Sequence, residues 1–295
     1  MGEKAVMRIR LMSPLGRYPN ADVKIGQSHM IIRKDIAFTA VVVMPSATHG
    51  FGVEHYSEIE ILAAEEIRFL GALTLSLHAE KGMVYAYPLP LEKNLPLARP
   101  EEPTKLWDAQ SLLIEARALA DAVPERWRTH GAILPPRMGG PPYMIHGADL
   151  DLDVFALLHR DVELTNWLAL RGLGTLVRAD MLFTRPELAE AALMMIFVAL
   201  EASLGLIWEK LKSAGNSAPT AMDAGRYLDS VFNPHLETGK YFESSYEDRI
   251  KIMHPASRFG VFAFPPASYD NYYDLRQDLH SVYAHLLVGK IWPVL

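Results

Sequence analysis

The feature that most constrains the fold is a long apolar segment at residues 189–211. It also carries Glu190, Glu201, Glu209 and Lys210, and charged side chains inside a bilayer are costly. The segment is therefore better interpreted as a buried helix of a helical bundle than as a membrane span.

The residues just before this segment are typical of a helix start. Thr184 is a capping residue, Pro186 fits the first turn, and Glu187 favours the positive end of the helix dipole. Apolar residues at helical spacing predict the remaining helices. These lie at residues 57–78, 106–122, 154–158, 162–177, 227–232, 240–254 and 269–287.

The first 100 residues have a mixed pattern. Residues 4–11, 29–33 and 36–44 are rich in β-branched and apolar side chains, which predicts strands, the last two paired with each other. Residues 13–22 have the Pro, Gly and Asn content of a loop. Residues 88–103 contain five prolines and are expected to form an extended linker.

These patterns predict a mainly α protein with a mixed α+β N-terminal part. We expect three regions along the chain. They are a mixed α+β region at 1–100, a helical connecting region at 104–179 and a helical domain at 180–295.

Composition excludes several kinds of site and compartment. Of the 295 residues, 50% are hydrophobic and 22% are charged, as in an ordinary globular protein. The chain has no cysteine, which excludes disulfides, cysteine metal sites and a thiol nucleophile and fits a reducing cytoplasm. The N-terminus does not have the pattern of a signal peptide. We therefore expect a cytoplasmic protein that does not contact a membrane.

Charge limits the contact with nucleic acid. The formal net charge is −6 at pH 7 and no run of Lys and Arg occurs. Affinity for a long nucleic acid comes mostly from phosphate contacts with basic side chains. DNA is therefore not an expected partner, and any contact with RNA has to come from a local basic patch.

Two patterns that resemble metal sites have simpler interpretations. Residues 149–153 alternate acidic and apolar side chains but lack the closing glutamate of a calcium loop, which favours a helix start with carboxylates near its positive end. His280 and His285 are five positions apart and do not face one metal from a helix. We expect no metal site and no cofactor.

An arginine and a histidine near the end of a predicted helix form the candidate site. Pro255 disfavours helical geometry at the preceding residue, so Arg249 lies in the last turns and His254 at the helix end. Five positions place the two side chains about 140° apart on an ideal helix, so they converge only if the backbone turns at His254. Together they suit a phosphate. The alternative is an ion pair of Arg249 with a neighbouring acid, Glu247 or Asp248, while His254 caps the helix.

Arg249-Ile-Lys-Ile-Met-His254 resembles the Arg, four residues, His signature of the HEPN superfamily. A second segment, Leu193-Met-Met-Ile-Phe-Val-Ala-Leu-Glu-Ala-Ser-Leu-Gly205, is similar to the long first helix of large bacterial HEPN proteins. The two segments occur in the order that the family shows. The resemblance covers about residues 180 to 295 and implies an antiparallel helical bundle.

The resemblance also implies a function. HEPN domains are commonly dimeric, and many are metal-independent ribonucleases. In a homodimer, two Arg249 side chains would hold the scissile phosphate while His254 acts as general acid or base on the RNA 2′-hydroxyl reaction. Lys251 and Arg258 would add positive charge for binding. Glu201 would be structural.

Two functional hypotheses follow from this resemblance. The first is an RNA-directed, metal-independent endoribonuclease of the toxin or phage-defence type. The second is a non-catalytic HEPN-like dimer that binds a nucleotide, RNA or a partner protein. Ile250 favours the second, because many active members carry a polar residue directly after the arginine. A third hypothesis is that the chain is a helical domain unrelated to the HEPN superfamily.

Overall fold

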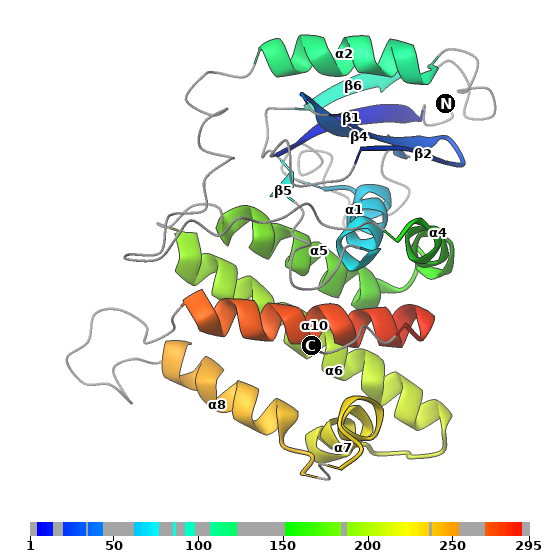
Figure 1. Cartoon of the computed structure of the whole chain (residues 1–295). Helices are drawn as coiled ribbons and strands as arrows, with labels where there is room; N and C mark the ends of the chain where they lie inside the picture. The colour runs from blue at the N-terminus through cyan, green and yellow to red at the C-terminus, as the bar shows by residue number, and fades with distance from the viewer. Residues whose placement is uncertain are drawn as a thin grey trace, which may run out of the picture.

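The computed structural model describes eleven parts of the chain, residues 5–13, 20–33, 35–43, 62–76, 85–86, 92–97, 107–122, 151–183, 188–235, 238–253 and 269–290. In these parts an N-terminal sheet with two helices adjoins a larger helical part (Figure 1). The predicted class, a mainly α protein with a mixed α+β N-terminal part, is confirmed.

The sheet is antiparallel in every described pairing. Its path runs β2-β3-β4-β1-β5, and β6 also pairs with β1. The strands are β1 (Val6–Ser13), β2 (Ala21–Ile25), β3 (Ser28–Ile32), β4 (Ala37–Val43), β5 (Tyr85–Ala86) and β6 (Glu92–Pro96). The three predicted strands are β1, β3 and β4, and β3 pairs with β4 as expected.

Two strands lie where the sequence predicted a loop and a linker. β2 overlaps the end of the expected loop at 13–22 and forms a hairpin with β3 through Gly26, whose φ of +59° suits a tight turn. The linker prediction for 88–103 was wrong over β6, which pairs with β1 and places Leu95 opposite Met7. A strand is possible here because the run from Leu91 to Leu95 contains no proline, so its backbone N–H groups can donate hydrogen bonds to β1.

The alternation of side chains along β1 divides the sheet into two packed faces. Met7, Ile9 and Leu11 belong to one apolar cluster with Leu112 and Ala116 of α2. Helix α2 (Ala109–Asp121) covers this face and starts at Asp108, whose carboxylate accepts a hydrogen bond from the backbone of Ser111. The other face packs against α1 (Ala64–Ser76) and joins the helical core.

The helical part is built around a hairpin of α5 (Trp167–Phe183) and α6 (Ala189–Ser213). Helix α10 (Tyr269–Val288) crosses this hairpin, and α4 (Leu152–Asp161) packs on α1 (Figure 1). Helix α7 (Ala221–Phe232) and α8 (Tyr241–Met253) pack together at the far side of α6. The expected helices are therefore present, but two of their bounds were wrong: residues 162–166 are not helical, and α7 begins at 221 and not at 227. Asp151 caps α4, as the interpretation of 149–153 as a helix start predicted. Thr184, Pro186 and Glu187 lie outside the described residues.

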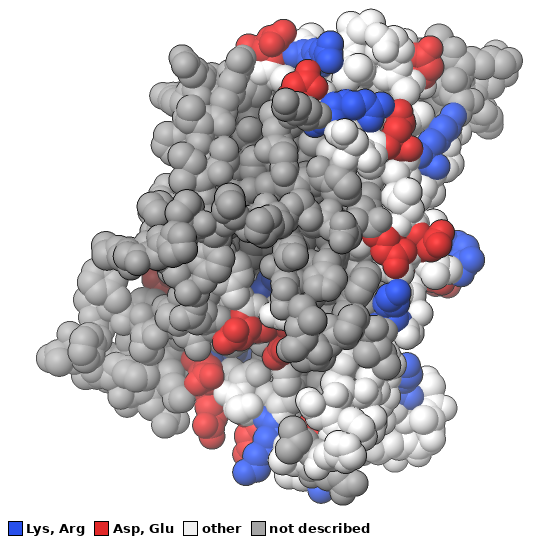
Figure 2. Space-filling view, in the orientation of Figure 1, with Lys and Arg blue, Asp and Glu red and all other residues white. Residues whose placement is uncertain are grey.

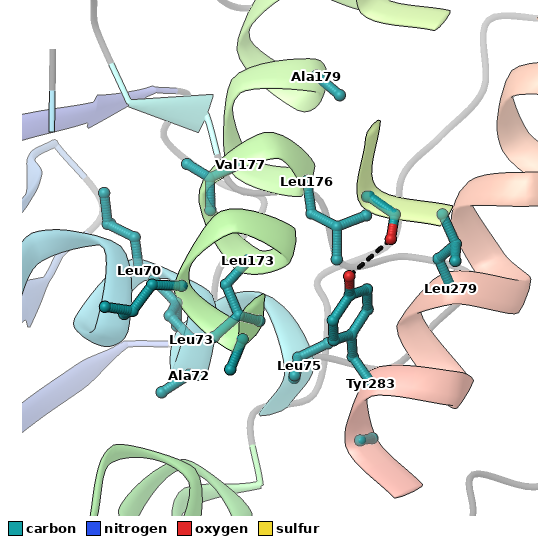
Figure 3. Close-up of a cluster of buried hydrophobic side chains, with 14 of the residues drawn as sticks. Leu70, Ala72, Leu73, Leu75, Leu173, Leu176, Val177, Ala179, Leu279 and Tyr283 are labelled. Atoms are coloured by element: carbon teal, nitrogen blue, oxygen red, sulfur yellow. Dashed lines mark hydrogen bonds between the residues drawn. The ribbon is translucent and has the colours of Figure 1, made fainter. Parts of the chain in front are cut away.

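One buried contact shows how closely α5, α6 and α10 pack. The Tyr283 hydroxyl of α10 donates a hydrogen bond of 2.7 Å to the carbonyl of Ala199 in α6 (Figure 3). A Cβ at Gly172 of α5 would lie 1.9 Å from the Tyr283 oxygen. A glycine at this position is therefore what allows the tyrosine to reach α6.

The main apolar cluster takes side chains from all three regions predicted along the chain. It includes Val41 of the sheet. It also includes Leu73 of α1, Leu173 of α5 and Leu279 of α10, which Figure 3 shows close together. The boundaries between the regions 1–100, 104–179 and 180–295 stay predictions. The described parts of these regions share one core.

Helix α6 is the most apolar helix of the described residues. Its length and hydropathy alone would allow it to cross a membrane, but 61% of the relevant window is buried inside the protein. Such burial is typical of the central helix of a bundle, as the sequence predicted.

The two histidines of α10 make structural contacts. His280 is buried, and its Nε2 lies 3.0 Å from the carbonyl of Thr74 in α1. His285 Nε2 lies 2.8 Å from the Tyr227 hydroxyl of α7. Both therefore link α10 to a neighbouring helix, in agreement with their interpretation as ordinary helix residues.

Candidate functional site

Helix α8 carries the candidate arginine close to its C-terminal end. The helix runs to Met253, directly before His254, so the predicted helix over 240–254 is confirmed up to that position. His254 and Arg258 lie outside the described residues. Lys251 belongs to α8, but its side chain is also outside the described part of the structure.

The start of α8 fixes its position beside α7. Phe242 is buried, and the amide of Gly239 donates a 2.7 Å hydrogen bond to the Asp229 carboxylate of α7. Gly239 has a φ of +65°, and its carbonyl oxygen lies 2.1 Å from where a Cβ of Gly225 would be. The close approach of these two glycines sets the turn that directs α8 back across α6.

Arg249 forms an ion pair with Glu201 of α6. The two side chains are 32% and 45% exposed, so the pair lies at the surface and solvent reaches both groups. The guanidinium carbon of Arg249 also lies 5.8 Å from the centre of the Tyr246 ring, one turn earlier in α8. Burial, with a further contribution from the charge of Glu201, raises the pKa of Tyr246.

The structure thus brings together the two segments that carry the HEPN resemblance. The sequence interpretation treated Glu201 as structural and gave an ion pair of Arg249 with Glu247 or Asp248 as the alternative to a phosphate site. The ion pair with Glu201, which spans 48 positions, was not predicted. One signal was available: Glu201 is the only charged residue in the run from Ala191 to Trp208. An acid in such a run needs a partner or solvent, and here it has both.

The described side chains around Arg249 do not form a basic surface. Glu243, Glu247 and Asp248 of α8 are exposed, and Ile250 next to the arginine is 40% exposed. Acidic and basic side chains are interspersed over the described surface in Figure 2, and that view shows no continuous basic stripe among the described residues. Long-range attraction of a polyanion is therefore weak here, and a phosphate would depend on the few cations next to it.

Metal chemistry finds no support in the described side chains. In that part of the chain, no group of three or more His, Asp or Glu residues is arranged to hold a metal ion. The most buried acid, Asp180 of α5, serves a structural contact: it accepts hydrogen bonds from Tyr272 and Arg276 of α10.

No family model matches the chain, and neither the curated proteins nor the solved structures contain a match. The residues and their geometry are therefore the basis for a function.

Proposed function

We propose that this protein is an RNA-directed, HEPN-like endoribonuclease that cleaves without a metal. Arg249 would hold the scissile phosphate, and His254 would move a proton to or from the reacting oxygens. Lys251 and Arg258 would bind the neighbouring phosphates. A homodimer would place two such sites across a twofold axis.

The observation that carries this proposal is the position of Arg249. It lies on the last turns of a helix that leads directly into His254, and Glu201 and Tyr246 hold its guanidinium at the surface. A carboxylate that orients an arginine leaves it pre-arranged for a second acceptor, because the guanidinium has five donors.

The direct test is incubation of the purified full chain with total RNA in the presence of EDTA. Wild type is expected to cleave, and His254→Ala to lose at least about 100-fold in rate, the usual size of a general acid–base contribution. His235→Ala is the matched control, since His235 is an exposed histidine on the turn after α7. Intact RNA after prolonged incubation with wild type would overturn the proposal.

A second candidate is a non-catalytic HEPN-like dimer that binds a nucleotide, RNA or a partner protein. Two observations favour it: the ion pair with Glu201 places a negative charge where a phosphate would bind, and exposed Ile250 offers apolar contact area. It predicts a stable dimer with no turnover. Sedimentation together with the RNA assay separates the candidates, because only the first requires RNA cleavage that depends on His254.

A further inference from the structure

Arg68 of α1 is a half-buried arginine that bonds to none of the described residues. Its Nε is fully buried and makes no hydrogen bond, and no ion pair joins its guanidinium to any described residue. Burial lowers its pKa, and the charge of Glu65 only partly opposes this effect. An arginine stays charged at neutral pH, so the position holds a cation that the surrounding protein compensates poorly.

The buried arginines elsewhere in the described structure are paired. The Nε of Arg10 lies 3.1 Å from a carboxylate oxygen of Glu66, and an Nη of Arg276 lies 2.9 Å from a carboxylate oxygen of Asp180. Glu66 is not available to Arg68, because it also accepts hydrogen bonds from Arg8 and from the backbone of Ala63, both at 2.9 Å. Among the described residues, each buried guanidinium group is thus paired with a carboxylate, whereas no described carboxylate forms an ion pair with Arg68.

A histidine of α4 packs on the residue that follows Arg68 in α1, and the charge of Arg68 acts on it. His159 of α4 packs edge-on against Phe69, with 5.5 Å between the ring centres. Burial, with a further contribution from the charge of Arg68, lowers the pKa of His159 to about 4. The imidazole is therefore neutral at pH 7 and has one N–H donor.

The charges nearby leave room for an anion. Glu65 is the carboxylate that acts on Arg68. On α4, Asp161 is exposed and pairs with Arg160. Phe69, which follows Arg68 in α1, packs edge-on against both Phe155 and His159, with 5.2 and 5.5 Å between the ring centres. A low local polarity strengthens the attraction between a guanidinium and an anion.

We propose that Arg68 and His159 form a binding site for a phosphate-type oxyanion between α1 and α4. The guanidinium would supply paired donors to two oxygens of the ligand and His159 one more. The site is separate from Arg249 and does not depend on the proposed nuclease activity. The same chemistry recognises a free phosphate group or a phosphodiester of RNA, and the test distinguishes them.

The test is a titration of the full-length protein, labelled with ¹³C and ¹⁵N at histidine, followed by NMR at constant ionic strength. The ligands are inorganic phosphate, adenosine monophosphate and a short RNA made resistant by 2′-O-methylation. His159→Gln assigns the resonance. Saturable shifts of His159 are expected, with a rise of its pKa when the anion binds, because a nearby negative charge favours the imidazolium.

Arg68→Met is expected to weaken binding by at least about tenfold, the effect of losing one charge-assisted hydrogen bond. Arg171→Met is the matched control, since Arg171 is an exposed arginine of α5. Thermal melts of both variants check the fold. Arg68→Lys should restore part of the affinity, which separates lost charge from a disturbed helix.

Each outcome decides the proposal. Saturation by phosphate and the mononucleotide alone assigns the site to small ligands, and saturation by the RNA alone assigns it to phosphodiesters. Wild-type resonances that stay unchanged with all three ligands would overturn the site. So would shifts that Arg68→Met leaves intact.

Discussion

Two arginine–carboxylate pairs hold helices of this protein together in different surroundings. Arg276 of α10 and Asp180 of α5 are 3% and 0% exposed, and Tyr272 adds a hydrogen bond of 2.9 Å to the same carboxylate. Arg249 of α8 and Glu201 of α6 are 32% and 45% exposed. The chemistry is the same, but water solvates one pair and is excluded from the other.

The difference teaches which pair is structural. Once two charges are buried, removing one leaves the other unpaired, and the fold loses several kcal/mol. An exposed pair is replaced by water at little cost, so it is free to exchange a partner for a ligand. The buried pair therefore fixes α10 on α5, and the exposed pair is the one suited to function.

The largest effect is expected from breaking the buried pair. Arg276→Met should lower the free energy of unfolding by about 3–5 kcal/mol, because Asp180 is left without its cation. Urea unfolding measures the loss. The double variant Asp180→Leu/Arg276→Met should recover part of it, and a double variant less stable than the single one would contradict this account.

Removing one hydrogen bond tests the same cluster more gently. Tyr272→Phe keeps the ring, which stacks on Phe183 with 3.9 Å between the ring centres. It removes the donor to Asp180, so a loss of about 1.5–3 kcal/mol is expected, the value of a hydrogen bond to a charged group. Urea unfolding at pH 7 measures it. A change below about 0.5 kcal/mol would mean that the hydroxyl is dispensable.

The half-buried His159 should have an intermediate effect on the free energy of unfolding. The pKa of His159 falls from 6.5 to about 4 in the folded protein, so the unfolded chain binds more protons between these values. The stability that His159 contributes above pH 6.5 is therefore lost as the pH falls towards 4. Solvent screening reduces the effect to about 1 kcal/mol.

Comparing urea unfolding of wild type and His159→Gln at pH 7.5 and pH 5 isolates this contribution. Burial, together with the charge of Asp274, raises the pKa of Asp278 to about 6, which acts in the opposite sense. Asp278 is present in both proteins, so its effect cancels in the difference. A variant that loses as much stability as wild type at pH 5 would exclude His159 as the source.

The smallest effect on stability is expected at the exposed pair. Glu201→Gln should change the free energy of unfolding by less than about 1 kcal/mol. Arg117→Gln is a matched control, because Arg117 pairs with Asp35 at the surface, at 56% and 65% exposure. If Glu201 orients Arg249 for RNA, Glu201→Gln should alter cleavage or RNA affinity while Arg117→Gln does not.

The sequence predicted the elements of the fold that have a clear local pattern. The helices follow the 3.6-residue period, and β1, β3 and β4 are rich in β-branched and apolar side chains. β6 was missed because Glu92, Lys93 and Asn94 lack strand propensity, and their pairing with β1 is a contact distant in sequence.

The candidate site could be predicted only in part. The helix that carries Arg249 follows from the local sequence pattern. The predicted end of the helix at His254 lies outside the described residues. The pairing with Glu201, and the packing of His159 on Phe69 of α1, arise from helix packing, which single-sequence patterns do not specify. The roles of His254, Lys251 and Arg258 stay predictions.

The hydrogen bond between His280 and Thr74 joins positions that are 206 residues apart. During synthesis, α1 therefore leaves the ribosome long before His280 of α10 has been made. In the same way, β1 is synthesised before β6, the strand that pairs with one of its edges. During that interval the apolar side of α1 and the edge of β1 have to be shielded in another way. We expect slow folding for a chain with contacts so distant in sequence, and a need for chaperones while it is being made.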